Sequence, residues 1–343
     1  MERRRMDGVT CVGGTLADIL ARPVGVMPNP GRVELVDEMR LAPGGCAVNS
    51  ASALTRLGVP ARLIGRIGRD GLGDFLVRTL VERGVDVAGL APTDTGTSAS
   101  MVFVSPGGER CLLHTLGAMG TFDSTDIDWS LAARSRVFFV AQFGLLGSFD
   151  WSAASALARA RESGMLTALD TVWDATGRLS DKVAPCLPLL DYFLPSYDEA
   201  KEITGLADPR AMARSFQDGG VGTVGIKLGK DGCYLRGTEG EEVFVPAFPV
   251  TAVDATGAGD AWCAGFIAGV LSGRDLAESG RLGNAVAACC VTALGAYDGI
   301  RTMAETLAFI ASSLRPWSAP GSSILPLFQD ADETIDSTQG GVA

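Results

Sequence analysis

Residues 254–260 place an acidic side chain directly after a run of small residues and at the start of a helical pattern. The segment reads Asp-Ala-Thr-Gly-Ala-Gly-Asp, and the residues that follow it, up to Leu271, are mostly apolar or small. The first N–H groups of a helix have no partner within the helix, and the helix dipole adds partial positive charge beside them. Because small residues let an anion come close, we expect the N–H groups of Gly257, Ala258 and Gly259 to be free to bind a phosphate.

Asp260 follows these small residues directly. In phosphoryl transfer, a carboxylate accepts the proton of the attacking hydroxyl while backbone dipoles neutralise charge on the moving group. Asp260 is therefore predicted to be the general base, with Gly257, Ala258 and Gly259 as the anion site. The alternative is an aspartate that caps an ordinary helix. The length of the whole string disfavours that alternative.

Two further segments carry residues that suit a polyhydroxylated substrate. Gly44 and Gly45 allow close backbone approach ahead of a helical pattern, and Asn49 in that pattern can both donate and accept hydrogen bonds. Asp18 follows the first predicted strand, where a carboxylate can accept two neighbouring hydroxyls. Taken alone, Asn49 could equally be a local cap and Asp18 an exposed loop residue.

The rest of the chain alternates short apolar runs with helical patterns that end at glycine. This alternation predicts βαβ units and a mostly parallel sheet. The predicted strands are Val9–Val12, Ala61–Ile67, Val137–Ala141, Leu166–Asp170, Tyr192–Leu194, Val221–Lys227 and Tyr234–Leu235. The predicted helices are Asn49–Leu57, Gly73–Arg83 and Ser152–Ser163.

Extended stretches interrupt this alternation. Val33–Leu41 reads as a strand, and Ser98–Ser105 with Arg110–Thr115 reads as a β-hairpin. We expect them to form a small sheet that acts as a lid, and exposed lid strands to pair in a homodimer. Residues 7–316 are predicted to be one domain with lid strands at about 19–42 and 96–117. Residues 317–343, rich in Ser, Gly, Pro and acids, are predicted to be a flexible tail.

Composition excludes several classes of protein. The net charge of −11 argues against a nucleic-acid partner. His114 is the only histidine, so a multi-histidine metal site or a Ser-His-Asp triad cannot form within the chain. Eight cysteines without a Cys-x-x-Cys pair suggest reduced thiols in the cytoplasm. No apolar run reaches the roughly 20 residues of a membrane helix, so we expect no membrane partner.

Taken in this order, these segments resemble the ribokinase-like carbohydrate kinases, also called the phosphofructokinase-B family. Gly44-Gly45-x-x-x-Asn49 is similar to the N-terminal signature of that family, and Asp254–Asp260 is similar to its C-terminal signature. The resemblance covers about residues 8–314. It implies a three-layer α/β/α sandwich with a mostly parallel central sheet and a small β-sheet lid.

The resemblance also implies a role for each matching position. Asp260 would be the base, and Asp18, Gly44, Gly45 and Asn49 would hold sugar hydroxyls. ATP and Mg²⁺ would be the cofactors, with Glu199 of the Asn-x-x-Glu motif near the magnesium. The residues that match nucleotide-binding positions are Ser196, Lys227, Gly229, Gly232 and Asn284. Asp254 and the backbone around Gly295 match the monovalent-cation site of potassium-activated members.

Two departures from the family pattern bear on the site. Ser196 stands where the motif has Asn, which would rearrange the water around magnesium. Lys227 stands where ribokinase tends to have Thr, so it would touch an ATP phosphate or pair with a surface acid. Asp170 is a minor candidate for the sugar or magnesium region. Arg110 and His114 on the lid hairpin are expected to be packed or solvated more readily than to bind substrate.

Several functions fit these residues. The leading prediction is a sugar kinase; a nucleoside kinase of the same fold and a non-catalytic sugar or nucleotide sensor are the alternatives. A Rossmann dehydrogenase is disfavoured because Gly13-Gly14-Thr15 replaces the Gly-x-Gly-x-x-Gly pattern after the first strand. Fructose, ribose and keto-sugar acids all remain candidates. A phosphorylated sugar is not expected, because no cluster of Arg or Lys is evident in the substrate segments.

Overall fold

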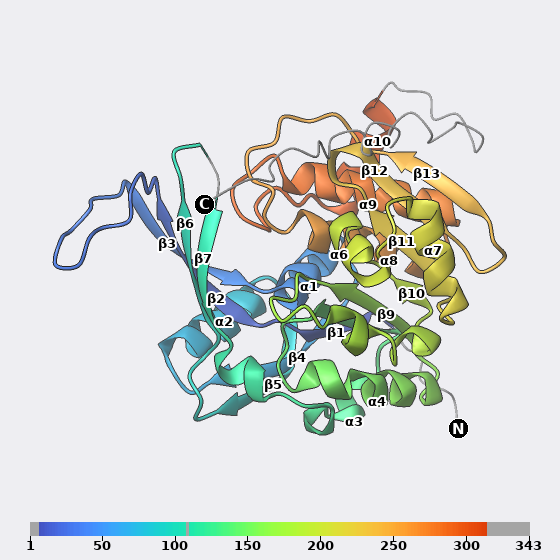
Figure 1. Ribbon diagram of the computed structural model, residues 1–343, viewed down its shortest axis with the longest axis horizontal. Helices are drawn as coiled ribbons and strands as arrows, with labels where there is room; N and C mark the ends of the chain where they lie inside the picture. Colours follow the sequence, from blue (N-terminus) through green and yellow to red (C-terminus); the bar gives the residue numbers. More distant parts are fainter. Residues whose placement is uncertain (1–6, 108–109, 314–343) are drawn as a thin grey trace, which may run out of the picture.

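The protein is described by a computed structural model that covers residues 7–107 and 110–313. A large sheet with helices on both sides forms the body, and a smaller sheet projects from one end of it (Figure 1). Within those ranges, no helix is both long and apolar enough to cross a membrane. The predicted tail, 317–343, lies outside the described residues.

Within the described residues, nine strands form the large sheet, in the order β13-β12-β11-β10-β9-β8-β1-β4-β5. Their bounds are β1 Val9–Gly13, β4 Ala61–Gly68, β5 Asp86–Thr93, β8 Val137–Phe143, β9 Leu166–Thr171, β10 Tyr192–Phe193, β11 Thr223–Lys227, β12 Gly232–Arg236 and β13 Glu242–Pro246. The strands from β11 to β5 pair in parallel, and β12 and β13 add antiparallel at one edge. The prediction of a mostly parallel central sheet is confirmed.

The central strands are buried on both faces, which explains why they read as continuous apolar runs. In β8, Phe139 packs into one core and Phe138 into the other, because side chains alternate along a strand. The first core includes side chains of α1 Cys46–Arg56, α2 Gly71–Glu82, α8 Ala258–Leu271 and α9 Leu276–Cys290. The second includes α3 Trp129–Ala132, α4 Phe149–Glu162, α5 Leu179–Val183, α6 Tyr197–Thr204 and α7 Pro209–Asp218. A last helix, α10, spans Met303–Ser312. The predicted three-layer α/β/α arrangement follows.

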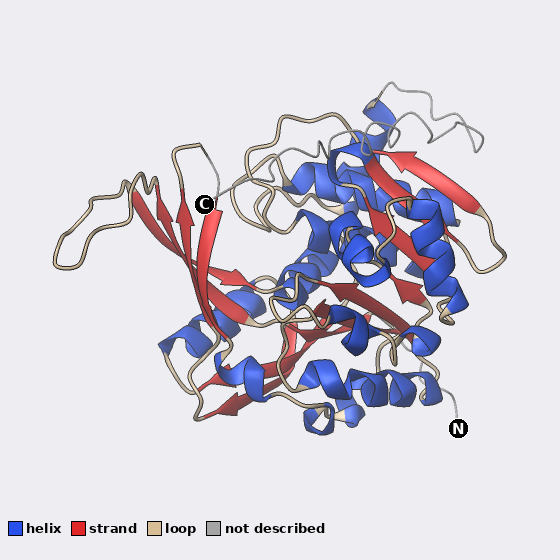
Figure 2. Cartoon of the chain, in the orientation of Figure 1, coloured by secondary structure: helices blue, strands red, loops and turns tan. Residues whose placement is uncertain are grey.

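In the part of the chain that the structure describes, the smaller sheet has four strands in the order β3-β2-β6-β7, and we call it the lid sheet (Figure 2). Its strands are β2 Leu16–Arg22, β3 Glu38–Gly44, β6 Ala99–Val104 and β7 Arg110–Thr115. β2 pairs antiparallel with β3 and parallel with β6, and β6 pairs antiparallel with β7. The predicted β-sheet lid and its hairpin are confirmed.

Two local predictions about the lid are wrong. The strand expected over Val33–Leu41 begins only at Glu38, because its partner β2 ends at Arg22, directly before Pro23, and earlier residues have no strand to pair with. Asp18 lies within β2 and not in a loop at the end of β1. The chain crosses from the body into the lid within the two residues Gly14 and Thr15, which the apolar pattern alone did not reveal.

Candidate active site

The Asp254–Asp260 segment forms a tight turn that starts α8. Gly257 caps the helix with φ 73°, and a Cβ at this position would lie 2.3 Å from the Ala296 Cβ, so the turn requires glycine. Among the described residues, the N–H groups of Gly257, Gly259 and Asp260 have no acceptor. The expectation of a free N–H at Ala258 is wrong, because it donates to the Ala255 carbonyl at 3.3 Å and closes the turn. The N–H groups that remain free to bind an anion are therefore those of Gly257, Gly259 and Asp260, and not those of Gly257, Ala258 and Gly259 as predicted.

Asp260 is buried in the first turn of α8 and contacts the N-terminal half of the chain. Its Oδ2 accepts a hydrogen bond from Asn49 Nδ2 at 2.8 Å, and its carbonyl accepts one from the Ser50 hydroxyl at 3.3 Å. Burial raises the pKa of Asp260, and the hydrogen bonds from Asn49 and Cys46 oppose this only in part. The structure thus joins two of the predicted segments, 211 positions apart, at one carboxylate.

Gly44 and Gly45 make room for groups of the protein itself. Gly44 ends β3, and a Cβ there would lie 2.1 Å from Asp18 Oδ2. Gly45 caps α1 with φ 96°, and a Cβ there would lie 2.3 Å from the Gly14 carbonyl oxygen. The two glycines therefore let β3 and α1 pass close to the Asp18 carboxylate and the crossover at Gly14.

Gln142 supports the start of α1, and sequence reasoning missed this role. Its Oε1 accepts a hydrogen bond from the Cys46 N–H at 3.0 Å. It adopts a positive φ of 72°, which is unusual for a residue other than glycine. No pattern in the sequence signals such a backbone conformation.

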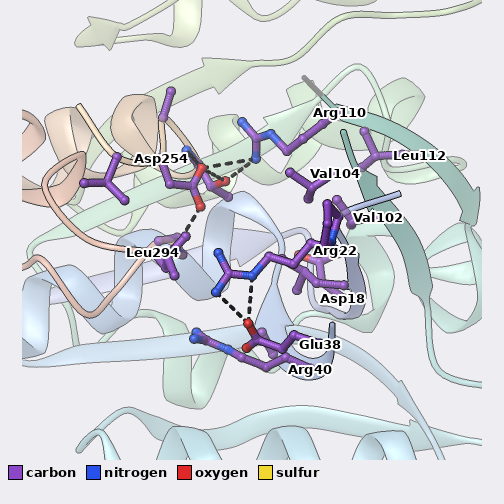
Figure 3. A pocket seen from close by; sticks show the side chains of 18 of the residues that line it. Asp18, Arg22, Glu38, Arg40, Val102, Val104, Arg110, Leu112, Asp254 and Leu294 are labelled. Atoms are coloured by element: carbon purple, nitrogen blue, oxygen red, sulfur yellow. Dashed lines mark hydrogen bonds and ion pairs between the residues drawn. The ribbon is translucent and has the colours of Figure 1, made fainter. Parts of the chain in front are cut away.

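A cavity of about 600 Å³ separates the lid sheet from the body (Figure 3). On the lid side it is lined mainly by alternate residues of the four strands, including Asp18, Leu20, Arg22, Glu38, Arg40, Ala42, Val102, Val104, Arg110 and Leu112. On the body side it is lined by Asn49, Val253–Thr256 and Leu294–Ala296. Asn49 therefore connects the cavity to Asp260. We call the lid surface that faces the cavity the inner face.

Asp18 is the acidic residue of the inner face nearest to the crossover from the body. Burial raises its pKa to about 6, although a hydrogen bond from Ser100 and the charge of Arg110 favour the ionised form. A partly buried carboxylate with open acceptor sites suits the recognition of hydroxyl groups.

Asp254 joins the turn before α8 to the loop after α9. Its Oδ1 accepts hydrogen bonds from the N–H and the hydroxyl of Thr256, at 2.9 and 2.5 Å, and its Oδ2 accepts one from the Gly295 N–H at 2.8 Å. Arg110 of the lid reaches across the cavity to the Thr256 hydroxyl and lies 3.6 Å from Asp254 Oδ1 (Figure 3). Burial opposes ionisation, but these donors outweigh it, so the pKa of Asp254 lies below its usual value.

Lys227 lies under the first turn of α8 and pairs with a buried acid. Its Nζ is 2.5 Å from Asp170 Oδ1 and 3.5 Å from the place that a Gly259 Cβ would occupy. Burial lowers the pKa of Lys227, but the negative groups around it, of which Asp170 has the largest effect, raise the pKa by more than burial lowers it. The lysine is therefore charged. The sequence predicted that Lys227 would contact either an ATP phosphate or a surface acid. The second prediction is wrong, because the acid that pairs with Lys227, Asp170, is only 2% exposed.

Ser196 and Glu199 form a capping box at the start of α6. The Ser196 hydroxyl accepts from the Glu199 N–H at 3.4 Å, and Glu199 Oε2 accepts from the Ser196 N–H at 2.8 Å. Glu199 Oε2 also accepts from the Thr171 hydroxyl at 2.9 Å. Burial raises the pKa of Glu199. Serine in place of asparagine thus caps the helix, and the other carboxylate oxygen, Oε1, has no hydrogen bond from a described residue.

Gly229, Gly232 and Asn284 lie along the edge of the body formed by β12 and β13. Gly229 has φ 59° in the turn before β12, and a Cβ on Gly232 would lie 2.1 Å from the Val245 carbonyl oxygen. Asn284 Nδ2 donates to that carbonyl at 2.8 Å, while its Oδ1 accepts from Trp262 Nε1 at 2.8 Å. Asn284 therefore ties α9 to α8 and β13. Neither these residues nor Lys227 and Glu199 line the cavity under the lid.

Comparison with known proteins matches this architecture to one family. The family model described as "pfkB family carbohydrate kinase" matches residues 6–303. The chain belongs to that family. It is a sugar kinase of the pfkB and ribokinase group, as the resemblance implied.

Individual relatives match between 72% and 89% of this kinase. An uncharacterized sugar kinase of Archaeoglobus fulgidus is 31% identical over 247 residues, which cover 72% of this chain and 97% of that one. Ribokinase of Haemophilus influenzae is 28% identical and covers 88% of this chain and 98% of its own. The structure of a putative ribokinase II from E. coli in complex with ATP and Mg²⁺ is 25% identical. It superposes with a TM-score of 0.79 over 89% of this kinase and 99% of that chain.

Proposed function

We propose that this kinase transfers the γ-phosphoryl group of ATP to a hydroxyl of a sugar, with Asp260 as the general base. The observation that carries the proposal is the position of Asp260: its buried carboxylate is bonded to Asn49 at the cavity, and the open N–H groups of the α8 turn adjoin it. Asn49 and Asp18 would hold sugar hydroxyls, with Gly44 and Gly45 shaping that side of the site. The open N–H groups of Gly257, Gly259 and Asp260 would neutralise charge on the transferred group.

The nucleotide would bind along the body beyond this turn. Gly229 and Gly232 would allow it to approach the backbone, Asn284 would order the adenine side, and Lys227 would face a phosphate. The open donors of the α8 turn suit a phosphate, and Oε1 of Glu199 suits a water of hydrated Mg²⁺, because magnesium is usually held by one or two carboxylates and substrate phosphates. Bound magnesium would neutralise phosphate charge. Ser196 would set the position of Glu199.

The test is ADP release by the purified full chain with ATP, Mg²⁺ and a panel of sugars and nucleosides. Turnover of at least one sugar, with weaker or no turnover of nucleosides, is expected. A preference for nucleosides would favour the nucleoside kinase instead. Tight sugar binding without ADP release from any compound would favour a sensor. We place the enzyme in the cytoplasm, where its eight free thiols would stay reduced.

A monovalent cation at Asp254 and Gly295 stays a prediction. A carboxylate offers about four acceptor sites, and Asp254 already accepts three hydrogen bonds and faces Arg110. A cation would therefore compete with Arg110. We expect weak activation of the wild-type enzyme by potassium relative to tetramethylammonium, and stronger activation of Arg110→Gln. The measurement is kcat in matched chloride salts, and the same ratio of rates in both proteins would contradict this coupling.

We also propose that residues 7–316 act as one domain and that two copies associate through the lid sheets. The lid surface opposite the cavity, its outer face, is apolar: Ile19 is flanked by Leu41 and Met101, and Met101 by Leu113. Met101 is 43% exposed and Leu113 63% exposed. The same patch on a second copy would complement it across a two-fold axis, as in most homodimers.

The mass in solution tests the association. Wild-type protein is expected to be dimeric by light scattering, and Met101→Glu/Leu113→Glu is expected to be monomeric because two charges would be buried at the contact. Val81→Glu is the matched control, since Val81 is 56% exposed near the C-terminal end of α2 and is not part of the lid sheet. A monomeric wild type, or a double variant that stays dimeric, would reject the proposal.

A further inference from the structure

Three arginines from three different strands face the same cavity. Arg22 lies on β2, Arg40 on β3 and Arg110 on β7, and Figure 3 shows all three side chains among those that line it. They are 18 and 70 positions apart in the sequence, so no basic cluster is visible there. The pairing register places Arg40 opposite Leu20, and Leu20 opposite Val102, all on the inner face. The premise that no cluster of arginine or lysine lies in the substrate segments is therefore wrong.

The three guanidinium groups differ in how well the protein neutralises them. Arg22 Nε donates to Glu38 at 2.7 Å, across the β2–β3 pair. Arg110 is engaged with Asp254 and Thr256. These two arginines are therefore satisfied by their neighbours.

Arg40 has much weaker partners. Among the described residues it makes no hydrogen bond, and its one ion pair is with Asp298 at 3.5 Å. The carboxylate of Asp298 is itself 55% exposed, so solvent screens that pair. Arg40 Nη2 lies 3.2 Å from the place that a Gly295 Cβ would occupy, on the body wall of the cavity. Its planar group of five donors thus lines the site without a hydrogen bond to any described residue.

We propose that the sugar substrate carries an anionic group, a carboxylate or a phosphate monoester, that pairs with Arg40. The inference rests on the proposed sugar kinase activity and names the class of acceptor. A guanidinium group binds both anions through two parallel hydrogen bonds. Leu20 lies opposite Arg40 on β2, with Val102 opposite Leu20 on its other side, so apolar side chains adjoin this position on the inner face.

The acidic residues that line the cavity have partners other than Arg40 or lie in solvent. Glu38 and Asp254 are held by Arg22, Arg110 and backbone donors, and Asp37 is exposed to solvent. Asp18 is opposite Ala42, two residues along β3 from Arg40. The substrate would therefore present hydroxyls to Asp18 and Asn49 and its anionic end to Arg40.

The experiment compares matched substrates with the purified full chain, ATP and Mg²⁺. A keto-sugar acid, a keto-sugar phosphate and a neutral keto-sugar of the same carbon number are assayed for ADP release. We expect kcat/KM for one of the anionic sugars to exceed that for the neutral sugar by roughly 10- to 100-fold, the range of one charge-assisted hydrogen-bonded pair. The carboxylate and phosphate arms distinguish the two sources of the anion.

Arg40→Gln is the diagnostic variant. It should raise KM for the preferred anionic sugar by roughly 10-fold or more, with little change in kcat or in KM for the neutral sugar and ATP. Arg32→Gln is the matched control, because Arg32 is an exposed arginine of the β2–β3 connection that does not line the cavity. A neutral sugar that matches or exceeds both anionic sugars, or an equal loss on neutral and anionic sugars in Arg40→Gln, would overturn the proposal.

A calorimetric arm separates this inference from the proposed activity. Binding of the same sugars is measured without ATP. If no sugar is phosphorylated, the proposed kinase function fails. The anionic preference then stands if the sugar acid or phosphate binds more tightly than the neutral sugar and loses that advantage in Arg40→Gln, and it falls if the affinities are equal.

Discussion

Asp260→Asn is expected to fold normally and to lose nearly all turnover. Asparagine can keep the hydrogen bond from Asn49 Nδ2 through its own carbonyl oxygen, so the α8 turn should stay intact. It cannot accept the hydroxyl proton, and general-base catalysis contributes roughly 10²- to 10⁴-fold in rate. The measurement is kcat with the best sugar of the panel, alongside thermal unfolding of the variant.

Asp74→Asn is the matched control for this variant. Asp74 also lies in the first turn of a helix, α2, but is exposed and does not line the cavity. It should leave kcat within about twofold of wild type, as expected for a surface substitution. If purified Asp260→Asn kept wild-type phosphoryl transfer, the proposed role of this carboxylate would be wrong.

The pH profile gives the same carboxylate a second signature. A general base must be ionised, and burial raises the pKa of Asp260 above the ordinary value of about 3.9. Activity should therefore be complete above that raised pKa and fall as the pH drops through it. The acid limb of kcat/KM should lie above the range of an ordinary aspartate, and a limb at or below it would contradict a buried base.

Lys227→Met is expected to have the second-largest effect, on both stability and nucleotide use. Removing the lysine leaves Asp170 buried without its cation, which should lower the free energy of unfolding by about 3–5 kcal/mol. Loss of a positive charge beneath the α8 turn should also raise KM for ATP. Urea denaturation and ATP-dependent kinetics measure the two effects separately.

A double variant separates the two roles of Lys227. Lys227→Met/Asp170→Asn removes both charges, so much of the lost stability should return, while KM for ATP should stay raised. Lys182→Met is the control, because Lys182 is equally buried and paired with Asp150 and Asp174 on the other side of the sheet. It should cost stability without changing KM for ATP in the folded enzyme. Recovery of wild-type ATP kinetics in the double variant would make the Lys227–Asp170 pair purely structural.

The fold class and the turn before α8 were predictable because their causes are local. A continuous apolar strand such as β8 must be buried on both faces, so alternating strands and helices imply the layered body. The small residues before Asp260 determine how the backbone can turn and which N–H groups remain open. Of the three N–H groups predicted to be free, only that of Ala258 is not, because the turn closes through its hydrogen bond to the Ala255 carbonyl.

The partners of each site residue could not be predicted, because they depend on which strands become neighbours. Asp18 lies in the lid, and not in a loop of the body, because β2 pairs with β3 and β6 and not with a strand of the body. Lys227 meets Asp170 because β11 and β9 both border the short strand β10.

The arginines of the lid show the same division between sequence and structure. Each of Arg22, Arg40 and Arg110 is an isolated basic residue in its own strand. Strand pairing and the twofold alternation of side chains place all three on the face toward the cavity. The sequence by itself determined the fold and the position of the proposed base, since both follow from residues adjacent in the chain. Only the tertiary structure decided which charges share the cavity, because long-range strand register brings them together.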